Sequence, residues 1–226
     1  MLLTSPLNRR TGAIALLALV HAIFRAAAMA IEEPQFEILA STDDYEVRRY
    51  DSYIVAETDV EGTYKNAGNK AFRILAGYIF GDNRASEKMA MTAPVESRPA
   101  DKSIKMKMTA PVASSPSEDE AGSYTYSFVM EKKYSLETLP VPNDPRVRIR
   151  VIPERTVAVH RYSGSWSESN YAKHERLLLD ALADDGISAR SAPVSARYNA
   201  PFTPWFMRRN EVMVEIEGDS QLASGK

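Results

Sequence analysis

Hydrophobic and polar positions change their spacing in the first half of the chain, from that of strands to that of a helix. Residues 45–60 (YEVRRYDSYIVAETDV) are rich in tyrosine and β-branched residues, and a turn signal at Asp51-Ser52 divides them into two predicted strands. From residue 63 to residue 80 the apolar residues recur every three or four positions, a spacing that places them on one face of a helix. Gly81 ends the predicted helix because glycine adopts the left-handed conformation at little cost. The apolar face consists of Tyr64, Ala67, Ala71, Ile74, Leu75 and Tyr78.

The second half opens with apolar residues that alternate with arginine. This alternation predicts a half-buried strand over residues 147–151, and Pro153-Glu154 then turns the chain into a second strand over residues 156–162. The apolar positions of the first of these strands are Val147, Ile149 and Val151.

A second amphipathic helix is expected to follow. Ser165 and Glu168 have the S-x-x-E spacing of a capping box, which predicts the start of the helix, and Asp185-Gly186 predicts its end. Its apolar face consists of Tyr171, His174, Leu178, Ala181 and Leu182.

Further strands are expected after each helix. One contains residues 92–95 (TAPV), another contains residues 199–202 (NAPF), and residues 210–217 (NEVMVEIE) form a closing strand. Residues 113–122 (ASSPSEDEAG) are polar, acidic and free of large apolar side chains, so a mobile loop between two strands is expected there.

The two halves resemble each other when the chain is shifted by 102 residues. This internal repeat, about residues 45–112 and 146–217, predicts an α+β fold of two β-α-β units, because neither unit can bury its own apolar face. We expect one antiparallel sheet, curled towards a barrel, with two helices against it; the alternative is a chance similarity. The matched positions are Val55-Ala56 with Val157-Ala158, Gly62 with Gly164, Tyr64 with Trp166 and Leu75 with Leu177.

The first thirty residues have the features of a signal peptide. Arg9-Arg10 precede an uncharged run over residues 12–24 that is shorter than the ~20 residues of a membrane span. Ala28-Met29-Ala30 supplies the small-x-small pattern of a cleavage site, so cleavage after Ala30 is expected. The product would be periplasmic or otherwise exported, with no membrane span after removal of the leader; the alternative is an uncleaved N-terminal anchor.

Charge and composition narrow the function classes. The formal charge of the chain is −2, and removal of a leader that carries three arginines and no acid leaves about −5. Such a balance argues against nucleic acid and against anionic lipid as partners. The absence of cysteine excludes a disulfide framework, a thiolate metal site and a cysteine nucleophile. No catalytic constellation is legible in the sequence, so an enzyme is not expected.

Four segments carry a family resemblance: residues 45–50 (YEVRRY), 88–95 (KMAMTAPV), 105–112 (KMKMTAPV) and 198–212 (YNAPFTPWFMRRNEV). With these segments the chain resembles the SOUL family of heme-binding proteins over about residues 35–217. The resemblance implies a domain over residues 31–217 with a duplicated β-α-β fold, a distorted antiparallel eight-strand barrel with two helices. Residues 218–226 would form a disordered tail. The family resemblance also implies that the protein binds heme or another tetrapyrrole non-covalently, as a carrier or buffer of this ligand.

Heme binding would require an apolar surface, donors for two propionates and, in some proteins, an axial ligand. The first helix offers an apolar and aromatic surface, although the same residues could simply face the sheet. His160 and His174 are candidate axial ligands, and Arg208 and Arg209 could pair with propionates or cap the last strand. The candidate residues of the first helix are Tyr64, Phe72, Leu75, Tyr78 and Ile79.

Two other functions are compatible with the sequence. The pocket of a SOUL-like fold could serve as an effector-binding or protein-interaction module that is not specific for heme. Alternatively, the methionine pairs Met89/Met91 and Met106/Met108 could bind Cu(I), because thioethers are soft ligands and alternate strand residues share a face. Alternate methionines are also typical of one buried strand face, which needs no metal.

Overall fold

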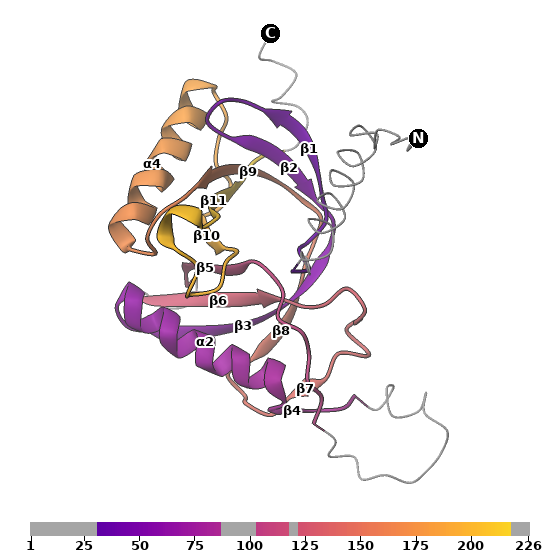
Figure 1. The fold of residues 1–226 in the computed structure, drawn as a ribbon. Helices are drawn as coiled ribbons and strands as arrows, with labels where there is room; N and C mark the ends of the chain where they lie inside the picture. Colours follow the sequence, from indigo (N-terminus) through magenta and orange to yellow (C-terminus); the bar gives the residue numbers. More distant parts are fainter. Residues whose placement is uncertain (1–30, 87–102, 118–121, 218–226) are drawn as a thin grey trace, which may run out of the picture. The chain divides into compact units, whose positions relative to one another are not determined.

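Nine β-strands form one antiparallel sheet in the computed structural model of the chain, which describes residues 31–86, 103–117 and 122–217 (Figure 1). The strand order is β1-β2-β9-β11-β10-β5-β6-β3-β8, so β1 and β8 are the edges of a sheet that curls into a half-barrel. The α+β fold expected from the sequence is therefore confirmed. The strands of this sheet are β1 (Phe36–Ser41), β2 (Glu46–Tyr50), β3 (Tyr53–Glu61), β5 (Val112–Pro116), β6 (Ser123–Val129), β8 (Arg148–Ile152), β9 (Arg155–Tyr162), β10 (Val194–Arg197) and β11 (Asn210–Glu215).

A separate two-stranded sheet pairs β4 (Asn83–Arg84) with β7 (Val141–Pro142). Strand β1 was not predicted from the sequence, and it is the reason that the large sheet has nine strands where eight were expected. Its burial does not alternate along the strand, because β1 lies at an edge and pairs only with β2. A strand of this kind lacks the two-residue period by which a half-buried strand is recognised.

Helix α2 (Tyr64–Phe80) begins and ends where the apolar spacing predicts. Thr63 is its N-cap, and Gly81 follows its last turn with a φ of 124°, a conformation that glycine adopts without the strain of a Cβ atom. The predicted face packs against β3 and β6, which confirms the helical interpretation of this segment.

Helix α4 (Glu168–Asp184) begins two residues later than a cap at Ser165 would place it. The N-cap is Ser167, whose hydroxyl accepts a hydrogen bond from the backbone N–H of Asn170 at 3.3 Å. The predicted capping box of Ser165 and Glu168 is therefore wrong. Four serines at alternate positions over residues 163–169 offered alternative caps, and the S-x-x-E spacing selected the wrong one.

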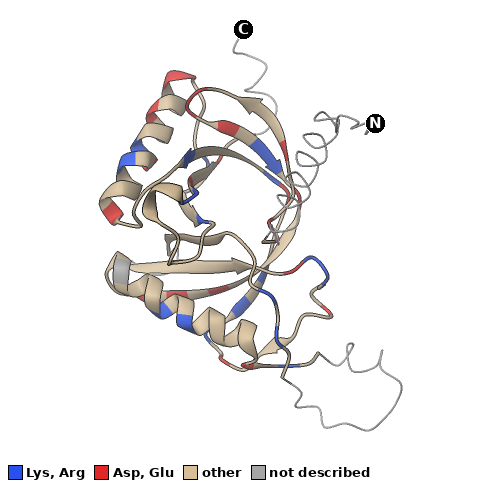
Figure 2. Cartoon of the chain, in the orientation of Figure 1, with Lys and Arg blue, Asp and Glu red and all other residues tan. Residues whose placement is uncertain are grey.

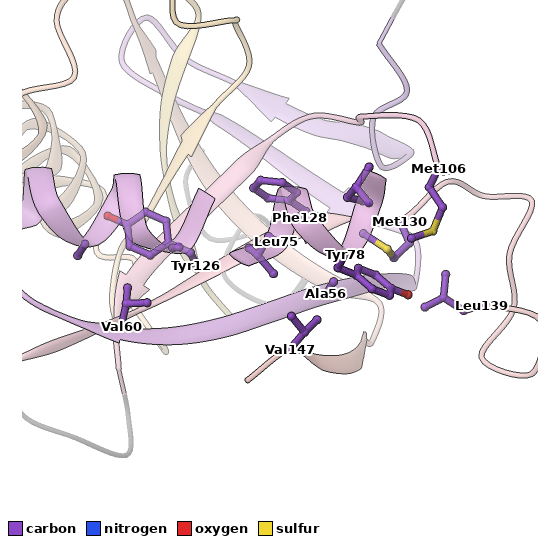
Figure 3. Packing of buried hydrophobic residues seen from close by; sticks show 13 residues of the cluster. Ala56, Val60, Leu75, Tyr78, Met106, Tyr126, Phe128, Met130, Leu139 and Val147 are labelled. Carbon is purple, nitrogen blue, oxygen red and sulfur yellow. The ribbon is translucent and has the colours of Figure 1, made fainter. Parts of the chain in front are cut away.

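Two hydrophobic clusters lie beneath the helices, one under each. Figure 3 shows the cluster under α2, in which Leu75 and Tyr78 of the helix meet Phe128 of β6 and Ala56 of β3. Leu178 and Leu182 anchor α4 over β9 and β11 in the same way. A third cluster lies on the opposite side of β9, because Ala158 faces α4 while Val157 and Val159 point the other way.

Three local expectations are corrected by the structure. Residues 199–202 form a loop between β10 and β11, since the strand of this region is β10, which ends at Arg197. Residues 112–116 form strand β5, so only the following part of the polar stretch connects two strands. Val151 is 40% exposed, because it lies on the edge strand β8.

Several sequence expectations lie outside the described residues. These are the leader, the first of the two KMxMTAPV segments with Met89 and Met91, and the C-terminal tail. Of the second methionine pair, Met106 is buried in the cluster under α2 (Figure 3). Met108 is partly buried and packs against the same cluster. Packing accounts for these two side chains without a metal.

The strands on the two sides of the sheet's centre follow a matching order. From the central pair of β10 and β5, the neighbours are β11, β9 and β2 on one side and β6, β3 and β8 on the other. Gly62 and Gly164 precede the two helices with φ values of 136° and 129°. The internal repeat stays a prediction, and this arrangement is the one that a repeat would produce.

Candidate functional site

A pocket of about 740 Å³ opens between the first turns of α2, the segment that leads into α4, and the end of β10. Its volume lies within the ~300–1,000 Å³ that is usual for small-molecule sites. Apolar and aromatic side chains supply most of the wall, with one cation and one carboxylate among them. This combination of walls suits an amphipathic ligand.

Helix α2 supplies one wall through residues spaced four apart. Tyr64, Gly68 and Phe72 lie on one helical face, and Phe72 remains 40% exposed because it borders the pocket. Gly68 leaves the middle of this face open; a Cβ atom there would lie 3.3 Å from the hydroxyl oxygen of Tyr126. Burial raises the pKa of Tyr126 to about 12, so this hydroxyl at the pocket wall stays neutral at physiological pH.

Trp166 forms the opposite wall, immediately before α4. Its indole N–H donates to Oδ1 of Asn210 at 2.8 Å, which fixes the plane of the ring. The guanidinium carbons of Arg197 and Arg208 lie 5.3 and 4.3 Å from the ring centroid, within the range of cation–π attraction. Trp166 is therefore a rigid aromatic surface.

Arg197, the last residue of β10, brings a positive charge into the pocket. Its Nη2 donates to the hydroxyl of Tyr64 at 2.8 Å, and its guanidinium carbon lies 5.2 Å from the Tyr64 ring centroid. No carboxylate of the described residues lies within salt-bridge distance of Arg197. Glu168 also borders the pocket, at the first turn of α4. An aromatic pocket that contains a cation without an acidic partner favours a ligand with its own anionic group.

The structure separates the predicted heme contacts of α2 into two groups. Tyr64 and Phe72 border the pocket, whereas Leu75, Tyr78 and Ile79 are at most 1% exposed and belong to the core beneath the helix. The hydroxyl of Tyr78 donates to the carbonyl of Pro140 at 2.7 Å, which satisfies its one polar group inside the core.

The two candidate axial histidines contact each other, and neither is among the residues that line the pocket. Nε2 of His160 on β9 lies 2.9 Å from Nδ1 of His174 on α4, and the Tyr162 ring stacks on His174 with centroids 4.0 Å apart. The other nitrogen of His160 bonds to the carbonyl of Asp44 at 2.6 Å. Burial, followed by the nearby His160 and Lys173, lowers the pKa of His174 to about 4.

Arg208 and Arg209 make mainly structural contacts. Arg208 donates to the carbonyls of Thr203 and Pro201 at 2.8 and 2.9 Å. Arg209 forms ion pairs with Glu33 and Glu211, both at 3.0 Å. Their role in binding propionates stays a prediction.

Sequence reasoning did not single out Trp166, Arg197 or Gly68 as site residues. One signal was available, since the repeat aligns Tyr64 with Trp166, and these two residues lie on opposite walls of one pocket. No comparable signal identified Arg197, because its contact with Tyr64 depends on how β10 and β5 pair at the centre of the sheet.

The described part of the chain contains no group of three or more His, Cys, Asp or Glu side chains arranged to hold a metal ion. Within the same residues, no helix has the length and apolar character needed to cross a membrane.

Several solved structures are distantly similar to this chain. The C-terminal domain of EcmrR is 10% identical, with a TM-score of 0.47 and coverage of 76% of this chain and 98% of that one. A hydrolase from Listeria innocua is 12% identical, with a TM-score of 0.48 and coverage of 79% and 94%. SAV2435 bound to tetraphenylphosphonium is 11% identical, with a TM-score of 0.41 and coverage of 77% and 94%.

Among curated proteins, none matches the chain. The family described as SOUL heme-binding protein matches residues 31–215, which is most of the sequence. The chain belongs to the SOUL heme-binding protein family.

Proposed function

We propose that this protein binds heme or a related tetrapyrrole reversibly in the pocket between α2, Trp166 and β10, and that it carries or buffers this ligand in an exported compartment. Family membership supports heme or tetrapyrrole binding in general. The observation that supports this particular pocket is Arg197, a cation among aromatic rings with no carboxylate partner in the described residues.

The residues of the pocket fit a flat apolar ring with carboxylates at its edge. Tyr64, Phe72 and Trp166 offer aromatic surface, and the guanidinium of Arg197 can donate two parallel hydrogen bonds to one carboxylate. Bound heme would supply an iron centre. The chain's own residues would hold the macrocycle, orient it through Arg197 and exclude water from its faces. Neither His160 nor His174 is among the residues that line this pocket.

Carriage is the proposed role because the sequence offers no catalytic constellation and the pocket is partly open to solvent. The exported location rests on the leader alone, with its uncharged run and its expected cleavage site after Ala30. Cell fractionation of the full-length protein, with N-terminal sequencing of the product, tests that part separately.

The same pocket would also accept other amphipathic aromatic anions. Arg197 recognises a carboxylate, and the aromatic walls recognise a planar apolar body, whichever molecule carries them. A module that is not specific for heme is therefore the second candidate function. Competition between haemin and an aromatic carboxylate without a macrocycle distinguishes the two.

Titration of residues 31–226 with haemin, followed by absorption in the Soret band, tests the proposal. We expect a saturable one-to-one change. Arg197→Gln should weaken binding roughly ten- to a hundredfold, because a hydrogen bond to a charged group contributes about 1.5–3 kcal/mol. Arg176→Gln is the matched control, since Arg176 is exposed on α4 and its side chain bonds only to the carbonyl of Ala172.

A second matched pair tests the aromatic wall. Phe72→Ala should weaken binding, whereas Phe80→Ala should not, because both residues are exposed on α2 and only Phe72 borders the pocket. The absence of a saturable change, or equal affinities for each variant and its control, would remove heme from this pocket. A Soret maximum that moves in His160→Ala or His174→Ala would place the iron elsewhere.

A further inference from the structure

The loop between β10 and β11 exposes four large apolar side chains within six residues. Phe202 is 89% exposed, and Trp205, Phe206 and Met207 are 62–65% exposed. Trp205–Met207 form the short helix η1. Single exposed apolar residues are ordinary, but a group at one loop tip marks an interaction surface. We call these four residues the apolar tip.

Hydrogen bonds hold the tip in this exposed position. The side chain of Arg208 donates to the carbonyls of Thr203 and Pro201, which closes the loop on itself. The backbone N–H of Gly164 donates to the carbonyl of Trp205 at 3.0 Å and fixes η1 to the segment before α4. The four side chains are therefore presented outward by an ordered loop, and they do not fold back onto the protein.

The chain around the tip is basic, although the whole protein is not. Residues 187–210 contain four arginines and no acidic residue, and Figure 2 shows no acidic colour along β10 and the loop that follows it. Arg190 and Arg209 pair with acidic residues from other segments. Arg197 and Arg208 have no carboxylate partner within the described residues. The net charge of the chain conceals this local excess.

We propose that the apolar tip inserts into the interfacial layer of a membrane that contains anionic phospholipid. Tryptophan and phenylalanine are the side chains that favour the boundary between headgroups and acyl chains, and a cation directly behind them meets the lipid phosphates. Arg208 follows the tip in sequence and lies at its base. Arg208, a cation at the base of the apolar tip with no carboxylate partner in the described residues, therefore complements an anionic bilayer surface.

Membrane docking of the apolar tip would also affect the pocket, because the two lie next to each other. Asn199 and Pro201, at the start of the same loop, border the pocket. Docking would place the pocket mouth beside the bilayer, so that an amphipathic ligand could pass between the two with little exposure to water. This consequence for the ligand rests on the proposed function. Membrane docking itself does not rest on it, and docking is tested below without any ligand.

Co-sedimentation of residues 31–226, which contain the compact unit of residues 32–226, with vesicles tests the proposal. We expect binding to vesicles of phosphatidylcholine with phosphatidylglycerol, at least several-fold weaker binding to phosphatidylcholine alone, and weakening by salt. Replacement of Phe202, Trp205 and Phe206 together by serine should lower the partition coefficient roughly tenfold or more. Phe80→Ser is the control, because Phe80 is similarly exposed at the far end of α2.

A second readout does not depend on the folding of the triple variant. Vesicles with dibrominated acyl chains should quench the tryptophan fluorescence of the unaltered sequence, and Trp205→Phe should abolish this quenching while Trp166 remains. Equal sedimentation of the triple variant and the control, or no quenching, overturns the proposal. Self-association that the triple variant loses, without vesicle binding, would assign the tip to a second copy of the chain. If the apolar tip bound a protein partner and the protein did not bind vesicles, membrane docking would also be overturned.

Discussion

Arg48 on β2 and Glu211 on β11 form an ion pair inside the curled sheet, with Nη1 3.1 Å from Oε2 and side chains that are 4% and 0% exposed. Glu211 also accepts hydrogen bonds from the hydroxyl of Tyr198 at 2.6 Å and from Nε of Arg209 at 3.0 Å. Burial and the adjacent Glu211 raise the pKa of Tyr198 far above its ordinary value, so the phenol remains a donor. The carboxylate thus satisfies three donors from three positions of the chain.

Replacement of Glu211 by alanine should lower the free energy of unfolding by about 3–5 kcal/mol, because it leaves the guanidinium of Arg48 buried with only Glu46 as an acidic partner. Urea unfolding at neutral pH measures the loss. Glu215→Ala is the control, because Glu215 lies on the same strand with a side chain that is 40% exposed and 4.0 Å from Arg155; its loss should cost about 1 kcal/mol or less. Equal costs for the two variants would contradict the structural role of Glu211.

The two helices and the antiparallel sheet could be predicted because their buried faces repeat at regular intervals. The face of α2 from Tyr64 to Tyr78 follows from spacing alone. The pocket could not be predicted in this way, since Arg197 contacts Tyr64, and Trp166 lines the same pocket, only because distant strands pair. Spacing also failed to separate Phe72, which borders the pocket, from the buried Ile79 on the same helix.

The burial of His174 beside His160 predicts a dependence of stability on pH. The pKa of His174 is lowered to about 4, against about 6.5 in an unfolded chain. Between these values the unfolded chain binds a proton that the folded chain does not, so stability is complete above pH 6.5 and decreases as the pH falls towards 4. We expect a loss of about 1–2 kcal/mol, reduced by solvent because His174 is only partly buried.

Urea unfolding of residues 31–226 at several pH values, compared with His174→Gln, measures this contribution. The comparison is needed because carboxylates also titrate in the lower part of the range, and they do so in both proteins. The difference between the two stability profiles should change between pH 6.5 and 4 and should be constant above pH 7. A difference that stays constant throughout would show that His174 titrates normally.

The corrected N-cap of α4 gives a direct comparison between two serines. Ser167→Ala should destabilise the protein by about 1 kcal/mol, because it removes the acceptor for the N–H of Asn170. Ser165→Ala should cost less than about 0.5 kcal/mol, since the hydroxyl of Ser165 bonds only to the hydroxyl of Ser167. The backbone carbonyl of residue 165 accepts a hydrogen bond from the side chain of Asn170, and alanine retains this carbonyl. Thermal unfolding of both variants decides between them; a larger cost at Ser165 would restore the cap predicted from the sequence.

Gly62 and Gly164 precede the two helices with similar positive φ values, and alanine should be strained at both. They differ in surroundings. A Cβ atom on Gly164 would lie 2.7 Å from Nδ2 of Asn170, whereas the nearest atom to a Cβ on Gly62 is 3.8 Å away. Gly62→Ala should therefore show the backbone strain alone, about 1–3 kcal/mol. Gly164→Ala should cost roughly 1 kcal/mol more, since Asn170 must move and lose its bond to the carbonyl of Ser165.

A double-mutant cycle separates the strain from the clash. With Asn170→Ala already present, Gly164→Ala no longer meets the amide nitrogen, and its additional cost should fall to that of Gly62→Ala. Urea unfolding of the four proteins of the cycle, with Gly62→Ala beside them, provides the values. An additional cost that persists without the Asn170 side chain would place the difference in the backbone of the two turns. The turns would then differ in conformational strain despite their similar φ values, which would weaken the case for an internal repeat.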